Sequence, residues 1–155
     1  MKFLYLSVLL LSSLCACSKQ EPIVGKLDPQ GAKLGIMITD WPKAVATNAE
    51  FPVEALLRNM GEQTLPAAVG EIGSPHQVYL SYHWLAMDGK PVIWDGTRAS
   101  IGAALKKSED RAAKLVVTAP PTPDNYILEL DVVQEGDFWF GGIGSQTSRV
   151  VITVQ

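Results

Sequence analysis

Two stretches of alternating sequence place polar and aromatic side chains where they could bind a ligand. Residues 78–85 and 126–133 alternate with the period of two that is typical of β-strands. If these strands are neighbours, one outward face carries six side chains of chemical interest: Tyr79, Ser81, His83, Glu129, Asp131 and Glu135. Aromatic rings beside carboxylates can hold a sugar by stacking on it and by accepting hydrogen bonds from its hydroxyl groups. A solvated face with cross-strand polar pairs is the alternative, and the more common arrangement.

A second candidate is the run of three aromatic residues Phe138, Trp139 and Phe140, which glycines follow at 141, 142 and 144. Successive side chains of an extended segment point to opposite sides, so at least one of the three should be exposed. Glycines give the adjoining loop conformational freedom, which suits a binding loop. The alternative is that Trp139 closes one end of the core. Trp94 and Arg98, in a WDGTR segment, and Trp41 are further candidates of this kind.

The inventory of reactive side chains argues against an enzyme or a metal site. A hydrolase needs an activated nucleophile or facing carboxylates, and a metal site needs three or four convergent ligands. Beyond residue 17 the chain has two histidines and no cysteine. His76 and His83 are seven residues apart, so in one strand they would point to opposite faces. We therefore expect no catalytic residues, no metal and no cofactor.

The elements that must position these residues are short strands. Alternation predicts strands at 34–38, 53–57, 78–85, 90–94, 114–118, 126–133 and 149–154. Asp88 and Gly89 predict a tight hairpin turn, and residues 101–111 a crossover between sheets. Trp84 should lie in the core, and Tyr126 should form a tyrosine corner. The pattern predicts an all-β, immunoglobulin-like antiparallel sandwich of seven or eight strands over residues 33–155.

The first residues predict export. Lys2 precedes twelve residues, 3–14, that are apolar apart from Tyr5 and three serines. At about 1.5 Å per residue they span roughly 18 Å, too short for a bilayer core of about 30 Å and typical of a signal peptide. The segment Leu14-Cys15-Ala16-Cys17 resembles the lipobox of bacterial lipoproteins, in which Cys17 would be acylated and anchored.

The resulting organisation is a signal peptide over 1–16, then the lipidated Cys17 with a flexible tether over 17–32. Ser18 resembles the sorting residue of outer-membrane lipoproteins, so we expect the chain in the bacterial cell envelope, at the outer membrane and facing the periplasm. An ordinary secretory signal with an incidental cysteine remains the alternative. The formal net charge of −3 gives no basis for nucleic-acid binding, which needs clustered cations.

Several motifs of the second half occur in the order of a known family. They are SYHWL at 81–85, DGK at 88–90, WDGTRAS at 94–100, Ala119-Pro120 before Asn125-Tyr126, and LDVVQEGDFWF at 130–140. This half resembles the immunoglobulin-like accessory domain appended to bacterial glycosyltransferases and methyltransferases. The family usually has proline after the WDG turn and Pro-Gly before the tyrosine; Ser100-Ile101-Gly102 and Asp124-Asn125 stand here instead.

The resemblance implies a non-catalytic module found near glycan chemistry, and it transfers no catalytic residue. Together with the aromatic residues, it leads us to expect a membrane-anchored lipoprotein that binds an envelope polysaccharide or a glycan-biosynthesis protein. The alternative is a structural lipoprotein that binds another envelope protein through the edge of a sheet.

Overall fold

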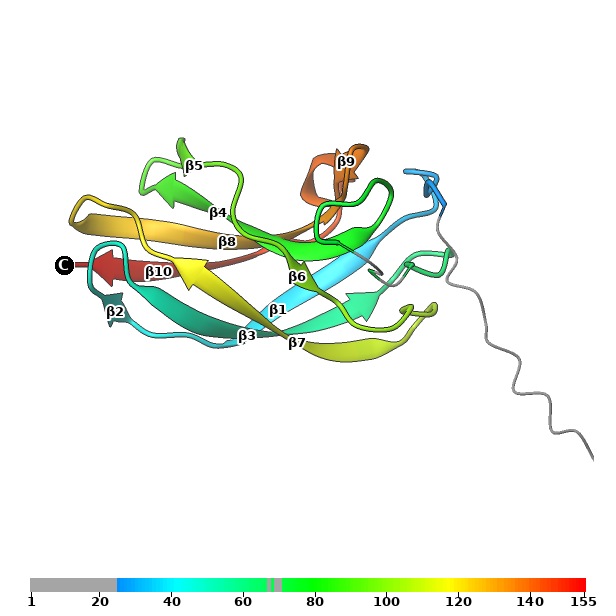
Figure 1. Cartoon of the computed structure of the whole chain (residues 1–155), viewed down its shortest axis with the longest axis horizontal. Helices are drawn as coiled ribbons and strands as arrows, with labels where there is room; N and C mark the ends of the chain where they lie inside the picture. Colours follow the sequence, from blue (N-terminus) through cyan, green and yellow to red (C-terminus); the bar gives the residue numbers. More distant parts are fainter. Residues whose placement is uncertain (1–24, 67, 69–70) are drawn as a thin grey trace, which may run out of the picture.

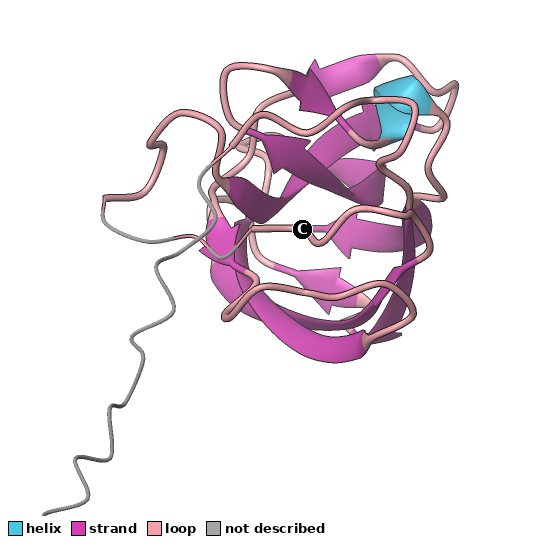
Figure 2. Ribbon diagram, turned by 90° about the vertical axis from the view of Figure 1, so that its right-hand side faces the viewer, coloured by secondary structure: helices cyan, strands magenta, loops and turns pink. Residues whose placement is uncertain are grey.

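The chain folds into two β-sheets packed face to face (Figures 1 and 2). The computed structural model describes residues 25–66, 68 and 71–155. Its elements are β1 (Leu34–Asp40), β2 (Ala44–Val45), β3 (Glu50–Asn59), β4 (Val78–Ala86), β5 (Pro91–Ile93), β6 (Ala99–Ser100), β7 (Asp110–Thr118), β8 (Asp124–Gln134), β9 (Phe138–Trp139), the short 3-10 helix η1 (Gly141–Ile143) and β10 (Ser148–Val154).

The two sheets have the strand orders expected of an immunoglobulin-like sandwich. One sheet is β1-β3-β7, and the other is β2-β10-β8-β4-β5, with β6 added to β4 and β9 to β8. The longer strands pair antiparallel, whereas the two-residue β2 runs parallel to β10. The predicted fold class is therefore confirmed, and β2, β6 and β9, of two residues each, are the strands that the alternating pattern did not indicate.

The core lies between the sheets and is built by alternate residues of each strand. In β3, for example, every second side chain is buried while those between are mostly exposed. Trp84 is fully buried and meets Phe51, Tyr82 and Tyr126 in edge-to-face contacts, with ring centroids 6.0 to 6.4 Å apart. The hydroxyl of Tyr126 donates to the carbonyl of Thr122 at 3.0 Å, which confirms the predicted tyrosine corner.

The outer face of β4 and β8 is not the solvated surface that was one of the two alternatives left open by the sequence. Eight of the nine residues of β4 are buried, including Tyr79, Ser81 and His83, so this face is not a solvated surface. The chain from β5 to β6 runs along the edge of β4, and the excursion from β9 through η1 folds back over β8 (Figure 1). Because these two segments cover part of the strand face, the polar side chains on it are largely shielded from solvent.

Residues at the start of the described chain pack on the sandwich. Leu27 and Ala32, which the sequence placed in the tether, belong to the core, so the packed domain reaches back beyond residue 33. The amide N–H of Leu27 donates to Oε1 of Gln134 at 3.0 Å. Lys26 Nζ lies 2.8 Å from a carboxylate oxygen of Asp137, which holds the pKa of Asp137 below its ordinary value. The predicted signal peptide and Cys17 lie outside the described residues.

The segment between β6 and β7 has the role that the sequence indicated. It carries the chain from β4's sheet to the sheet of β1 and β3, and it contains no helix. Leu105 pairs with Leu65 in an isolated bridge, and both side chains are fully buried. The predicted crossover is therefore confirmed. The Asp88-Gly89 hairpin is also present, with Gly89 in the left-handed region at φ +85°.

Candidate functional site

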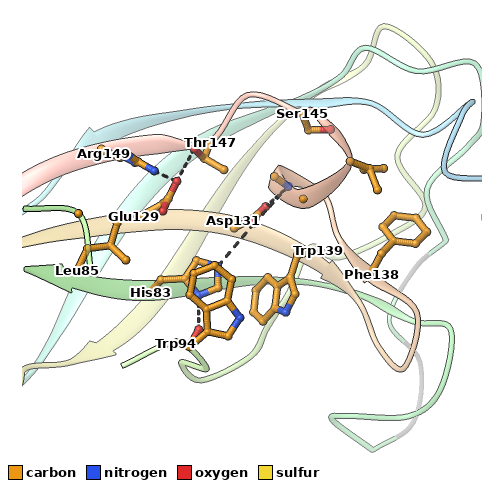
Figure 3. Close-up of a pocket in the computed structure, with 14 residues that line it drawn as sticks. His83, Leu85, Trp94, Glu129, Asp131, Phe138, Trp139, Ser145, Thr147 and Arg149 are labelled. Carbon is orange, nitrogen blue, oxygen red and sulfur yellow. Dashed lines mark hydrogen bonds and ion pairs between the residues drawn. The ribbon is translucent and has the colours of Figure 1, made fainter. Parts of the chain in front are cut away.

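A groove of about 540 Å³ runs over the outer face of β4, β8 and β10 (Figure 3). The hairpin between β4 and β5 lies at one end, and β9 with η1 lies at the other. Its size falls within the range of small-molecule binding sites. The charged and aromatic side chains that line it are His83, Trp94, Glu129, Asp131, Phe138, Trp139 and Arg149.

The floor of the groove is a row of side chains across three adjacent strands. His83 of β4 pairs with Glu129 of β8, and Glu129 pairs in turn with Arg149 of β10. Oε1 of Glu129 accepts hydrogen bonds from Thr147 Oγ1 at 2.6 Å and from Arg149 Nε at 3.0 Å. Glu129 is buried, whereas the side chain of Arg149 is more than half exposed at the rim. The row thus presents a carboxylate with an arginine beside it.

Two tryptophans form the aromatic wall of the groove. The ring of Trp94 stacks on the imidazole of His83, with centroids 3.9 Å apart and planes 13° from parallel. Trp139 meets His83 in an edge-to-face contact at 4.4 Å. Nδ1 of His83 also hydrogen-bonds the carbonyl oxygen of Trp94, which fixes the loop to the strand. Trp94 keeps 51% of its surface exposed despite these contacts, so an aromatic surface remains available.

Asp131 connects the groove floor to η1. Its Oδ1 accepts a hydrogen bond from the backbone N–H of Gly141 at 2.9 Å. A side chain at position 141 would not fit, since a Cβ there would lie 2.7 Å from Oδ2 of Asp131 and 2.8 Å from the Thr147 methyl. The glycine after the aromatic run therefore serves close packing as well as loop geometry.

Arg98 lies behind Trp139 in a network of acidic partners. Its Nε donates to Glu135 at 2.9 Å and its Nη1 to Asp95 at 2.5 Å, while the guanidinium lies 5.0 Å from the centroid of the Trp139 ring. Burial alone would lower the pKa of Arg98, but the hydrogen bonds to Glu135 and Asp95 raise it above its ordinary value. Arg98 therefore stabilises the position of Trp139 and does not line the groove.

The structure brings six of the nine predicted ligand-binding residues together and separates three. His83, Trp94, Glu129, Asp131, Phe138 and Trp139 line the groove. Phe140 is fully buried in the core, which corrects its assignment as a contact. Tyr79 is also buried, and its hydroxyl donates to Gln77 at 2.8 Å. Arg98 is the third, because it lies behind Trp139 and bonds to Glu135 and Asp95.

Thr147, Arg149 and Ser145 are groove residues that the sequence reasoning missed. They come from β10 and the segment before it. The signal was present for Arg149, since it alternates with the partly buried Val150 along a predicted strand and carries the charge complementary to Glu129. It could be used only once the register between β8 and β10 was known.

Among residues 25–66, 68 and 71–155, no cluster of three or more His, Cys, Asp or Glu side chains could hold a metal ion. Over the same residues, no helix has the length and apolar character needed to cross a membrane.

No protein-family model and no curated protein matched the sequence. Among solved structures, the CARDB domain of a Pyrococcus furiosus protein is 14% identical, with a TM-score of 0.47 over 86% of this chain and 97% of that one. A β-glucosidase from Listeria innocua, in complex with isofagomine, is 11% identical with a TM-score of 0.45, and one from Erythrobacter marinus is 8% identical with a TM-score of 0.47. This chain matches 16% of each β-glucosidase.

Proposed function

We propose that this chain is a non-catalytic lipoprotein of the bacterial cell envelope that binds glycan in the groove over β4, β8 and β10. The observation that carries the proposal is Trp94, which stands half exposed in a groove whose floor holds the carboxylates of Glu129 and Asp131. The apolar C–H face of a sugar stacks on such a ring, and its hydroxyls donate to carboxylates. The resemblance of residues 81–140 to a glycan-associated accessory domain supports the same ligand class.

The anchoring part of the proposal rests on the sequence. Acylated Cys17 would anchor the domain at the membrane. The domain could then bind envelope glycan within the distance set by the short segment between Cys17 and Leu27. Outer-membrane placement on the periplasmic side follows from Ser18 and is part of the same proposal.

The test is to replace Trp94 with alanine and measure glycan binding by calorimetry. The full-length chain in detergent micelles would be titrated with hexasaccharides of β-1,4-linked glucose and of N-acetylglucosamine. We expect Trp94→Ala to weaken binding about tenfold, or about 1.4 kcal/mol, because the stacking surface is lost. Met37→Ala, which removes a similarly exposed apolar side chain from the opposite sheet, should leave the affinity for both hexasaccharides unchanged. Equal affinities of wild type and Trp94→Ala would contradict the proposal.

A second candidate is partner binding by strand addition, favoured by the position of β7. This nine-residue strand pairs with β3 and forms one edge of the three-stranded sheet. An exposed edge can pair with an extended segment of another envelope protein through main-chain hydrogen bonds. Such binding would not depend on Trp94, so the same variant separates the two candidates.

A further inference from the structure

The groove is lined by two carboxylates and one arginine. Oε1 of Glu129 accepts two hydrogen bonds, but Oε2 makes none with any described residue. Glu129 and Asp131 line the groove together with a single arginine, Arg149, whose Nε donates to Glu129. The charged side chains that line the groove therefore leave an excess of one negative charge. A ligand that brings donors and positive charge would complement it.

His83 adds a ring nitrogen with no hydrogen-bond partner. A carbonyl oxygen can only accept, so the contact with Trp94 places a hydrogen on Nδ1 of His83. Nε2 is buried, and it is the one buried side-chain nitrogen or oxygen in the described chain that has no hydrogen-bond partner. It lies 3.7 Å from Oδ2 of Asp131, beyond hydrogen-bond distance. The ring of Trp139 meets the imidazole edge-to-face at 4.4 Å.

The aromatic wall is also suited to a cation. Arg98, which does not line the groove, lies over the ring of Trp139 in a cation–π arrangement. Trp94 offers an exposed indole, the side chain that interacts most strongly with cations. A primary ammonium group has three N–H donors and one positive charge, which match the free Oε2 of Glu129 and the exposed ring.

From these three observations we infer that the groove selects sugars that carry a free amino group, such as N-deacetylated hexosamines. The ammonium group donates to Glu129 and lies against Trp94, while the rest of the sugar stacks in the groove. This inference rests on the proposed function and narrows its ligand class. An N-acetyl group would cancel the charge and remove two of the three donors.

The test compares three hexasaccharides that share the β-1,4 linkage, titrated by calorimetry into the full-length chain in detergent micelles. They are built of glucosamine, N-acetylglucosamine and glucose. We expect the glucosamine oligomer to bind at least tenfold more tightly than the other two, with an affinity that falls as salt is added. Equal or tighter binding of the neutral oligomers would overturn the amine preference and leave glycan binding intact. No binding of any of the three would overturn both.

Glu129→Gln tests the assigned contact. The amide keeps an acceptor for Thr147 and nearly the same volume, but it removes the negative charge, so the preference for glucosamine should fall to less than threefold. Glu54→Gln is the matched control, because Glu54 forms an exposed ion pair with Lys114 on the opposite sheet. A tenfold preference that survives in Glu129→Gln, with a wild-type circular dichroism spectrum, would overturn the inference.

Discussion

Replacing Trp84 with alanine should lower the free energy of unfolding by about 3–5 kcal/mol, the range for removing a large aromatic side chain from a core. Trp84 is completely buried, and its ring packs edge-to-face against Phe51, Tyr82 and Tyr126. Its Nε1 donates to the carbonyl of Thr118 in β7 at 2.9 Å, so the side chain also bonds the two sheets to each other. Alanine would leave a cavity and an unpaired carbonyl.

Urea denaturation measures this effect, with the loss read from the midpoint at constant slope. Trp84→Phe should lower the free energy of unfolding by less than Trp84→Ala does, because phenylalanine keeps an aromatic ring. Only the hydrogen bond and part of the side-chain volume are removed. Trp94→Ala, at the half-exposed tryptophan of the groove, should change stability by less than about 1 kcal/mol. A loss below 1 kcal/mol for Trp84→Ala would mean that the packing between the sheets is not as described.

Gly96→Ala should lower the free energy of unfolding by about 1–3 kcal/mol and weaken glycan binding as well. A Cβ at position 96 would lie 2.7 Å from three ring atoms of Tyr82, which is buried and cannot move aside freely. The backbone N–H of Gly96 donates to the carbonyl of Tyr82 at 3.0 Å. The added methyl would therefore push the loop off β4, and Trp94, two residues earlier, would move with it.

Gly142→Ala is the matched control for this variant. Gly142 lines the same groove, but a Cβ there would meet no atom within 4 Å. Its substitution should change stability by no more than about 0.5 kcal/mol. Stability is measured by urea denaturation and binding by calorimetry. If Gly96→Ala bound glycan as tightly as Gly142→Ala, the position of Trp94 would not matter for the ligand.

Much of the fold could be predicted because strand periodicity and turn residues are local signals. The alternation of residues 78–85 separates the core side chains of β4, such as Trp84, from the outward ones, such as His83. The same parity argument placed Glu129 and Asp131 on the outward side of β8, and the register confirms that Glu129 lies opposite His83. Strand periodicity and turn residues depend only on neighbours along the chain, so the facing of each side chain could be predicted without knowing how the strands pair.

What could not be predicted depends on the path of loops in three dimensions. The burial of Tyr79 follows from the segments that cover the sheet, and nothing in residues 78–85 indicates them. The chain reverses at Gly136, which lies in the left-handed region at φ +77°, and β9 then pairs with β8. This pairing directs the next residue, Phe140, into the core. Arg149 joins the site only through the pairing of β10 with β8. Long-range register decides each of these positions.

The central claim, that the groove over β4, β8 and β10 is the glycan-binding site, is tested most directly by the indole N–H signals in a nitrogen-15 NMR spectrum. The chain has four tryptophans, of which Trp94 and Trp139 line the groove, whereas Trp84 lies in the core and Trp41 lies under Lys43. On addition of the glucosamine hexasaccharide, we predict saturable shifts of the Trp94 and Trp139 signals and none for Trp84 or Trp41. Saturable binding that leaves both groove signals unmoved would contradict the account.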